Sequence, residues 1–197
     1  EQGPPFTLSS WIEYFGIDMY QHHIKLATIP GVFSYGRLDR GSEKLLDLML
    51  GDKPLKFKGR VLDFGCGAGV IGISAKLANP DIELECVDIN WLALECSKLS
   101  CEANSIPAKV YASDGWSGVT ERVDTVLSNP PFHSGIATEY GTTDQFIRGA
   151  KDKMTKHAPL VIVANSFLKY SATIEQTFGR CEVLAEDSKF RVYLGRR

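Results

Sequence analysis

The residues with the clearest chemical meaning in this chain form one short run, Asn129, Pro130, Pro131 and Phe132, which follows an apolar stretch at 123–128. Prolines cannot continue a sheet ladder, and each fixes its own φ and restricts the residue before it. We therefore expect a strand that ends in a stiff corner. An amide oxygen and a backbone carbonyl are both acceptors, so the corner could hold an –NH2 group while the phenyl ring stacks on the planar system bearing it.

A glycine-rich run at 63–69 is the second group of interest, and we expect it to join a strand to a helix. Glycines at such a turn permit a tight bend and a close approach of the backbone to a ligand at the helix N-terminus. The spacing is GxGxG rather than the GxGxxG of dinucleotide-binding proteins, and no lysine follows as a P-loop requires. A turn that merely needs positive φ is the alternative. The residues that could contribute to a site here are Asp63, Gly65, Cys66, Gly67 and Gly69.

Two acidic residues follow the next two expected strands. Asp88 ends the run 83–88, and Asp114 comes shortly after the run 108–112. In a doubly wound sheet the carboxyl ends of adjacent strands lie side by side, so Asp88 could accept hydrogen bonds from both hydroxyls of a ribose. Asp114 could accept one from an adenine amino group. The alternatives are a helix-capping role for Asp88 and an ordinary Asp-Gly turn at Asp114.

The elements that must position these residues follow from hydrophobic periodicity, because short β-rich runs alternate with amphipathic helical runs from about residue 42 onward. Such alternation predicts an α/β fold, a doubly wound and mostly parallel seven-stranded sheet that ends in an antiparallel C-terminal hairpin. Ser42 is the expected N-cap of the first helix. The predicted strands are 60–64, 83–88, 108–112, 123–128, 160–164, 181–184 and 190–194, and the predicted helices are 42–50, 70–78, 91–104, 142–156 and 174–178.

The first 32 residues have a different character. We expect a short helix at 11–15 and a strand at 24–29, within a lead-in or linker segment (1–32) that packs on a domain spanning 33–197. The chain begins with Glu1 rather than Met, which favours a trimmed piece of a longer protein.

Composition limits the class of protein. Of the 197 residues, 44% are hydrophobic and 23% charged, as in ordinary soluble globular domains, and no apolar run is long enough to span a membrane. Five cysteines without a CxxC pair argue against a disulfide framework or a metal site, and favour a reducing cytoplasm. The net charge of −2 gives no overall attraction to nucleic acid.

The glycine turn, the two acidic residues and the proline corner, taken in this order, resemble the class I S-adenosylmethionine-dependent methyltransferases over 33–197. More narrowly, PGVFS at 30–34, LDRGS at 38–42 and the runs 61–69, 128–134, 147–150 and 163–168 are similar to the RsmC-type 16S rRNA guanine-N2 methyltransferases. The resemblance implies a Rossmann-like domain, 16S rRNA or the 30S subunit as partner, and a second, degenerate methyltransferase-like domain before this one. It implies S-adenosylmethionine as cofactor, bound by Asp63, Gly65, Cys66, Gly67, Gly69, Asp88, Asp114 and Asn129.

The resemblance also assigns lesser roles near the corner. Phe33, Arg37 and Ser42 would cover the cofactor or meet phosphate, and Asn165 would help to close the pocket. His133 is expected to be a surface or structural histidine rather than a base.

The chemistry implied for the corner is simple, because a sulfonium methyl donor carries a good leaving group and needs no covalent nucleophile. Hydrogen bonds from the amine to Asn129 and to the Pro130 carbonyl would stabilise the positive charge that develops on its nitrogen, while Phe132 stacks on a flipped or unpaired base. The same corner would also suit adenine N6 in nucleic acid or a protein glutamine amide. A non-catalytic RNA-binding or assembly module is the alternative of a different class, and a nicotinamide-dependent dehydrogenase is a distant third.

Overall fold

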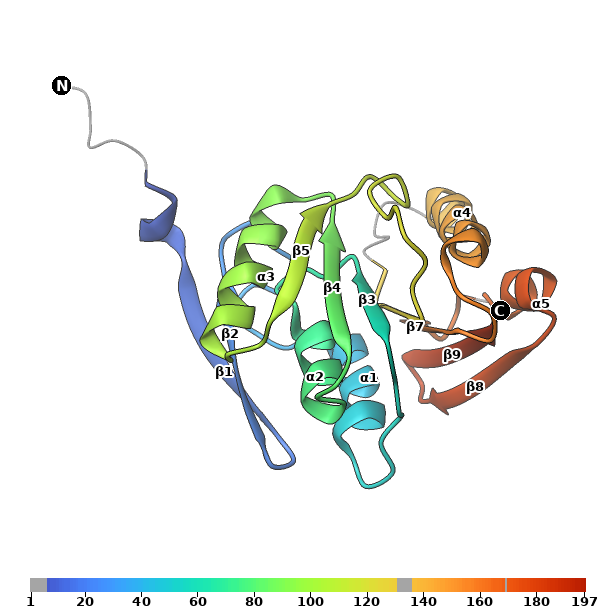
Figure 1. The fold of residues 1–197 in the computed structure, drawn as a ribbon, viewed down its shortest axis with the longest axis horizontal. Helices are drawn as coiled ribbons and strands as arrows, with labels where there is room; N and C mark the ends of the chain where they lie inside the picture. The colour runs from blue at the N-terminus through green and yellow to red at the C-terminus, as the bar shows by residue number, and fades with distance from the viewer. Residues whose placement is uncertain (1–6, 131–135, 169) are drawn as a thin grey trace.

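Helices pack on both faces of a central seven-stranded sheet in the computed structural model, which describes residues 7–130, 136–168 and 170–197 (Figure 1). The strand order is β5-β4-β3-β6-β7-β9-β8, and β9 runs opposite to the other six strands of this sheet. The predicted α/β fold class, with its antiparallel C-terminal hairpin, is confirmed. The strands are β3 (Arg60–Phe64), β4 (Glu83–Asp88), β5 (Ala108–Ala112), β6 (Thr125–Ser128), β7 (Pro159–Asn165), β8 (Cys181–Glu186) and β9 (Phe190–Arg196).

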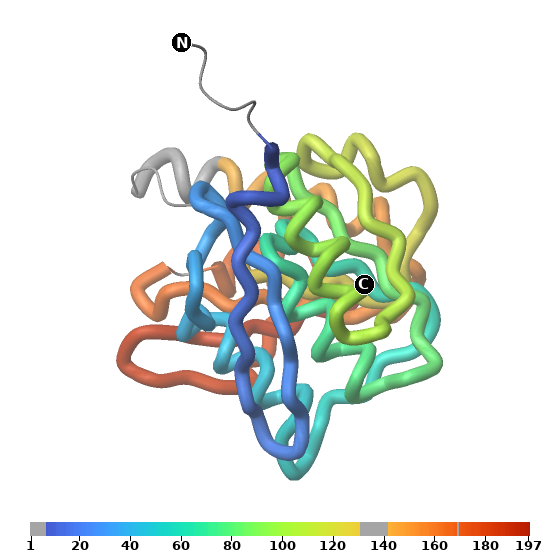
Figure 2. Tube along the Cα trace, turned by 90° about the vertical axis from the view of Figure 1, so that its left-hand side faces the viewer, coloured from blue at the N-terminus to red at the C-terminus, as the bar shows by residue number. Residues whose placement is uncertain are grey.

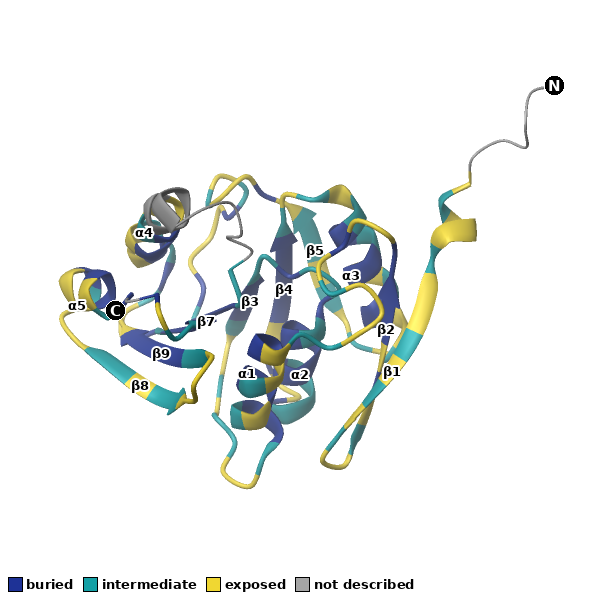
Figure 3. Cartoon of the chain, turned by 180° about the vertical axis from the view of Figure 1, so that it is seen from behind, coloured by how far each residue is buried: buried dark blue, intermediate teal, exposed yellow. Residues whose placement is uncertain are grey.

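The described helices divide between the two faces of the sheet. They are α1 (Arg40–Leu50), α2 (Val70–Ala78), α3 (Trp91–Ala103), α4 (Ile136–Lys153) and α5 (Ser171–Phe178). Because side chains alternate along a strand, Val61 packs with the α1 and α2 side chains on one face, whereas Leu62 packs with α4 and α5 on the other. Figure 3 shows the central strands as largely buried. This two-sided burial is why they are continuous apolar runs in the sequence.

The N-terminal segment differs from the prediction. The expected helix at 11–15 is wrong: a 3-10 turn, η1 (Leu8–Trp11), is followed by an antiparallel hairpin of β1 (Glu13–Met19) and β2 (His22–Thr28). Phe15, Ile17 and Met19 pack on the core at every second position, which is the period of a strand. Figure 2 views the molecule with this hairpin in front.

The hairpin is attached to α3 by backbone-to-side-chain hydrogen bonds. The Ala27 N–H donates to Ser100 Oγ over 2.9 Å, and Lys25 N–H donates to Asn104 Oδ1 over 3.0 Å. Asn104 Nδ2 donates back to the Lys25 carbonyl over 2.7 Å. None of the helices that the structure describes has the length and apolarity needed to cross a membrane.

The start of α1 also differs from the prediction. Ser42 is not the N-cap, because the helix begins two residues earlier and Asp39 caps it. Asp39 Oδ2 accepts a hydrogen bond from the Ser42 N–H over 2.9 Å, which satisfies one of the free donors of the first turn. Helix α1 is held firmly in the core by Leu45, Leu46 and Met49, all of which are 0% exposed.

Candidate functional site

The glycine turn folds over the end of β4. Gly65, Gly67 and Gly69 all have positive φ, at 71°, 53° and 85°, and the N–H groups of Gly65 and Cys66 both donate to the Val87 carbonyl over 2.9 Å. Gly69 is the N-cap residue of α2. The turn therefore needs glycine for its backbone conformation, and it lies directly before the N-terminus of α2.

Asp88 connects this turn to the start of α3. Its Oδ2 accepts from the Gly67 N–H over 3.0 Å, and its Oδ1 accepts from the Asn90 N–H over 2.9 Å. The helix-capping alternative for Asp88 is wrong, because Asn90 is the cap of α3 and accepts from the Leu92 N–H over 3.0 Å. Each oxygen of Asp88 keeps further lone-pair capacity, and the residue is only half-buried.

Asp63 lies behind the turn rather than on its surface. It is 0% exposed, and its Oδ2 accepts from the Gly72 N–H over 2.8 Å. Burial raises the pKa of this carboxyl to about 7; the Gly72 N–H opposes the shift, and the charge of Asp88 adds to it. Neither Asp63 nor Gly69 is among the residues that line the two large cavities in front of the turn, so both hold the turn from behind.

These two cavities, of about 440 and 420 Å3, meet at Gly65, Asp88 and Ile89, which line both of them. The first cavity extends past Asp114 to an aromatic wall. The second contains Cys66 and Gly67 and reaches the corner after β6, together with Phe33, Arg37, Asp39, Ser42 and Asn129. The two cavities form one elongated cleft along the carboxyl ends of β3, β4 and β6.

The aromatic wall of the first cavity consists of Phe64, Trp116 and Phe146. The rings of Trp116 and Phe146 are parallel to within 3°, with centroids 5.3 Å apart, and Phe64 lies 4.6 and 4.5 Å from them. Trp116 Nε1 donates to the Phe146 carbonyl over 3.0 Å, so the indole is fixed in position. This end of the cleft is suited to a flat ring with polar edges, with Asp114 as an available acceptor.

The corner after β6 is held by the start of α1. Asn129 Nδ2 donates to Asp39 Oδ2 over 2.7 Å and to Ser42 Oγ over 3.0 Å. A carboxylate can only accept, so the amide nitrogen must face Asp39. Because both of these hydrogen bonds are made by the nitrogen, the amide oxygen is directed elsewhere and can serve as an acceptor.

A third cavity, of about 140 Å3, also borders Asn129 and is lined by Pro130, Asn165 and Phe190 as well. Asn129, Asp39 and Phe33 line both this cavity and the second one. The amide therefore lies where the cleft and the smaller cavity meet.

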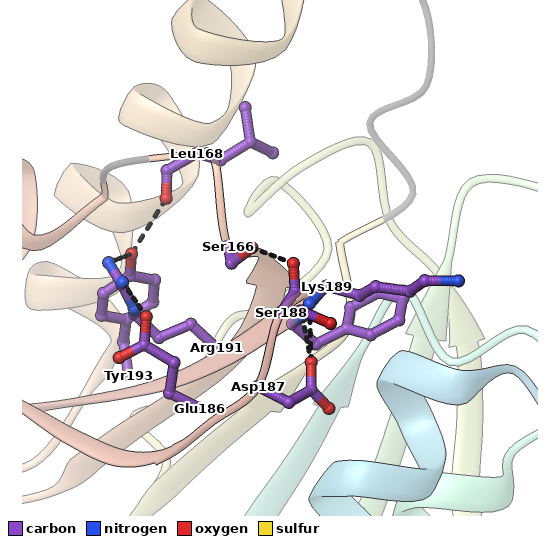
Figure 4. A network of polar contacts seen from close by, with 9 residues as sticks. Ser166, Leu168, Glu186, Asp187, Ser188, Lys189, Arg191 and Tyr193 are labelled. Carbon is purple, nitrogen blue, oxygen red and sulfur yellow. Dashed lines mark hydrogen bonds and ion pairs between the residues drawn. The ribbon is translucent and has the colours of Figure 1, made fainter.

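Hydrogen bonds join the loop after β7 to the C-terminal hairpin (Figure 4), and Leu168 and Phe190 of these two segments line the third cavity. Ser166 Oγ donates to the Ser188 carbonyl over 3.1 Å, and Tyr193 Oη donates to the Leu168 carbonyl over 2.9 Å. These contacts position Asn165 and Phe190, which are paired across β7 and β9. The antiparallel hairpin thus helps to shape the site.

The structure brings together most of the residues that the sequence indicated. Gly65, Cys66, Gly67, Asp88, Asp114 and Asn129 line the cleft, and Pro130 and Asn165 line the third cavity. Pro131, Phe132 and His133 lie outside the described residues. Within the described part of the chain, no group of three or more His, Cys, Asp or Glu side chains could hold a metal ion.

Some residues of the site had no predicted role, among them Asp39, Phe64, Ile89, Trp116 and Phe146. Asp39 had a usable signal, since Asp is a preferred N-cap residue and Asp39 shortly precedes the amphipathic run that forms α1. Ile89, which is 70% exposed, carried a weaker one, as an apolar residue directly after a strand-ending Asp. Trp116 and Phe146 are separated by 30 positions and had no local signal.

Comparisons with known proteins agree with the resemblance seen in the sequence. A family model, the methyltransferase small domain, matches residues 23–194. The ribosomal RNA small subunit methyltransferase C of Aliivibrio fischeri (strain ATCC 700601 / ES114) is 42% identical over 193 residues, which is 98% of this chain and 56% of the relative. The protein of the same name from Shewanella denitrificans is 42% identical over 196 residues, covering 100% of this chain and 55% of the relative.

Among solved structures, the T. Thermophilus 16S rRNA N2 methyltransferase RsmC in complex with AdoMet and guanosine has a TM-score of 0.84 and 25% identity. The match covers 100% of this chain and 53% of that one. A Pyrococcus furiosus methyltransferase matches with a TM-score of 0.69 and 12% identity, covering 88% of each chain, which speaks for the fold alone. The chain spans about half the length of the curated relatives that it matches.

Proposed function

Because the chain belongs to the methyltransferase small domain family, we propose that it transfers a methyl group from S-adenosylmethionine to the exocyclic N2 amine of a guanine in 16S rRNA. The observation that carries the proposal is the position of Asn129, between the long cleft and the third cavity, with its amide nitrogen engaged and its oxygen able to accept. The names of the relatives and the guanosine bound by the T. Thermophilus enzyme support this choice of acceptor.

The residues of the cleft fit S-adenosylmethionine. A Cβ at Gly67 or Gly115 would meet no atom within 4 Å, so the backbone at both places borders open space that a ligand can enter. In this proposal Asp88 accepts from the ribose hydroxyls, Asp114 accepts from the adenine amine, and the adenine lies beside the aromatic wall. The backbone of Gly65, Cys66 and Gly67 lines the path to the corner, while Asp63 and Gly69 support the turn from behind. When bound, the cofactor supplies an electrophilic methyl group on sulfur.

The corner residues act on the acceptor. Asn129 Oδ1 and the Pro130 carbonyl accept the two N–H groups of the amine, which orients its lone pair and stabilises the positive charge that develops on nitrogen. Phe132 is proposed to stack on the base. The methylated nitrogen is strongly acidic and loses its proton without a dedicated base. A base within a duplex cannot reach this position, so the guanine must be flipped out or unpaired.

The net charge of −2 gives the chain no overall attraction to RNA, whereas phosphate contacts usually supply most of the affinity of a protein for RNA. We therefore propose that further sequence, such as that in the longer relatives, or a structured ribosomal surface supplies part of the recognition. We also propose that the protein acts in the cytoplasm, where small ribosomal subunits are found.

The identity of the methylated nucleoside tests this function. The chain is incubated with deuterated-methyl S-adenosylmethionine and small subunits that lack the modification, and the rRNA is digested and analysed by mass spectrometry. Labelled N2-methylguanosine is expected. Labelled N6-methyladenosine, or label only in a protein glutamine, would favour the alternative acceptors, and the absence of both transfer and cofactor binding would favour a non-catalytic module.

A further inference from the structure

We propose that Asp39 is a positioning residue for Asn129, whose amide it holds in the single orientation that can bind the acceptor amine. The inference rests on the proposed function, in which Asn129 Oδ1 is the acceptor. Asp39, the N-cap residue of α1, then also orients a side chain that lies 90 positions away in the sequence.

The geometry places one carboxylate oxygen between two partners. Asp39 Oδ2 accepts from the Ser42 N–H over 2.9 Å and from Asn129 Nδ2 over 2.7 Å. The first bond fixes Asp39 on the end of α1, whose apolar face is fully buried. The second transfers that fixed position to the corner after β6. Asn129 is therefore positioned by a rigid helix and not only by the strand that precedes it.

The charge of Asp39, rather than the contact alone, determines which way the amide faces. A Ser hydroxyl can both donate and accept, so Ser42 Oγ could bond to either end of the Asn129 amide. A carboxylate cannot donate, and a flipped amide would place its oxygen against Asp39 Oδ2. The Asp39 contact thus disfavours the flipped state of the amide. In that state Nδ2 would face the acceptor amine, and two hydrogen-bond donors would oppose each other.

The same contact favours the reaction electrostatically. A charge-assisted hydrogen bond to Nδ2 polarises the amide and increases the negative charge on its oxygen. That oxygen contacts the amine on which positive charge develops, so its interaction with the amine is strengthened as the reaction proceeds. Loss of Asp39 should therefore affect the rate of transfer more than the binding of either substrate.

A rival explanation exists because Asp39 also lines the second cavity, where it could contact the methyl donor directly. The two explanations differ in what they predict for cofactor affinity. In our proposal the dissociation constant of the cofactor is unchanged by the loss of Asp39, whereas direct contact requires it to rise.

The test compares three variants with the wild-type chain. Asp39→Ser keeps a good N-cap residue but is too short to hold Asn129. Ser42→Ala removes only the hydroxyl. Asp47→Ser is the matched control, the same change on the same helix, at a residue whose side chain accepts a hydrogen bond from Tyr20. Equal urea midpoints would establish that the fold is intact.

Calorimetry with S-adenosylmethionine and single-turnover methyl transfer to small subunits then separate binding from chemistry. For Asp39→Ser we expect a rate about 100-fold lower, as for a misplaced reacting group, with unchanged cofactor affinity. Ser42→Ala should lose about fivefold, the effect of one neutral hydrogen bond, and Asp47→Ser should match the wild type. A rate close to the wild type for Asp39→Ser, or a cofactor affinity that falls in step with the rate, would overturn the proposal.

A measurement that needs no methyl acceptor tests the positioning role of Asp39 separately from the proposed methyl transfer. In 15N-edited NMR spectra, assigned with Asn129→Gln, the Asn129 side-chain amide signals should move strongly in Asp39→Ser and remain in place in Asp47→Ser. If they move as expected while the wild type forms no methylguanosine, the proposed function fails and the positioning stands. If they do not move, the positioning role is refuted whatever the substrate.

Discussion

Gly69 provides a sharp test of how the glycine turn is built, because two independent constraints exclude a side chain there. Its φ is 85°, and a Cβ would lie 2.7 Å from the Oγ of Ser97, a residue with 0% exposure. Gly67 shares the first constraint, with a φ of 53°, but a Cβ there would meet nothing within 4 Å. The pair of alanine substitutions therefore separates backbone strain from steric overlap.

The expected magnitudes follow from these two terms. An L-residue in the left-handed region costs about 1–2 kcal/mol, which applies to both variants, and Ala also reduces the entropy of the unfolded chain equally in both. Overpacking against buried Ser97 adds about 1–3 kcal/mol for Gly69→Ala alone. Gly69→Ala should thus be the less stable of the two by this second amount.

Urea unfolding of both variants measures the difference, and a second substitution identifies its cause. The Cα and Cβ atoms of Ser97 would lie 3.5 Å from a Cβ at Gly69, which is ordinary contact, so Ser97→Ala removes the overlap with Oγ and leaves the rest of the packing in place. The double variant Gly69→Ala/Ser97→Ala should return to the stability of Gly67→Ala. Equal destabilisation by the two glycine substitutions, or no recovery in the double variant, would refute this explanation of the turn.

Three further outcomes are expected. Asp63 has a folded-state pKa of about 7, above its usual 3.8, so the native chain holds a proton that the unfolded chain releases, and stability falls as pH rises from about 4 to 7. Asp63→Asn cannot titrate and should lack this slope, a difference of at most about 4 kcal/mol in urea unfolding; parallel pH profiles would contradict it. Asp88→Asn replaces one of two accepting oxygens with a donor, so calorimetry should give a cofactor affinity at least about tenfold lower, and unchanged affinity would remove Asp88 from the binding site. In Gly149→Ala a Cβ would lie 2.5 Å from Trp116 Cδ1, so the indole must move, and both tryptophan fluorescence and cofactor affinity should change. No change in either would show that the aromatic wall accommodates the added methyl group.

The central sheet can be predicted from the sequence because its strands are buried on both faces. Such strands are continuous apolar runs bounded by helices with a different period, and the predicted bounds of β3, β4 and β5 match the structure. The N-terminal hairpin is harder to predict because aromatic residues at 11–15 cluster without an obvious period. Its core-facing positions, Phe15, Ile17 and Met19, show period two only when the whole strand is considered.

The candidate site likewise has residues that can be predicted from the sequence and contacts that cannot. Residues at strand ends, such as Asp88 and Asn129, can be identified because a parallel sheet brings those ends together whatever the details of packing. The contact between Asp39 and Asn129, and the stack of Trp116 on Phe146, join segments that only the tertiary structure brings together. No local pattern in the sequence encodes them.

The rate at which Asn129→Ala forms N2-methylguanosine in a single turnover, with saturating S-adenosylmethionine, tests the central claim most directly. If Asn129 Oδ1 holds the amine beside the methyl donor, that rate should fall by about 100-fold or more, while the dissociation constant of the cofactor stays close to that of the wild type. A rate near the wild-type value would show that the amine is held elsewhere and would contradict the role proposed for Asn129.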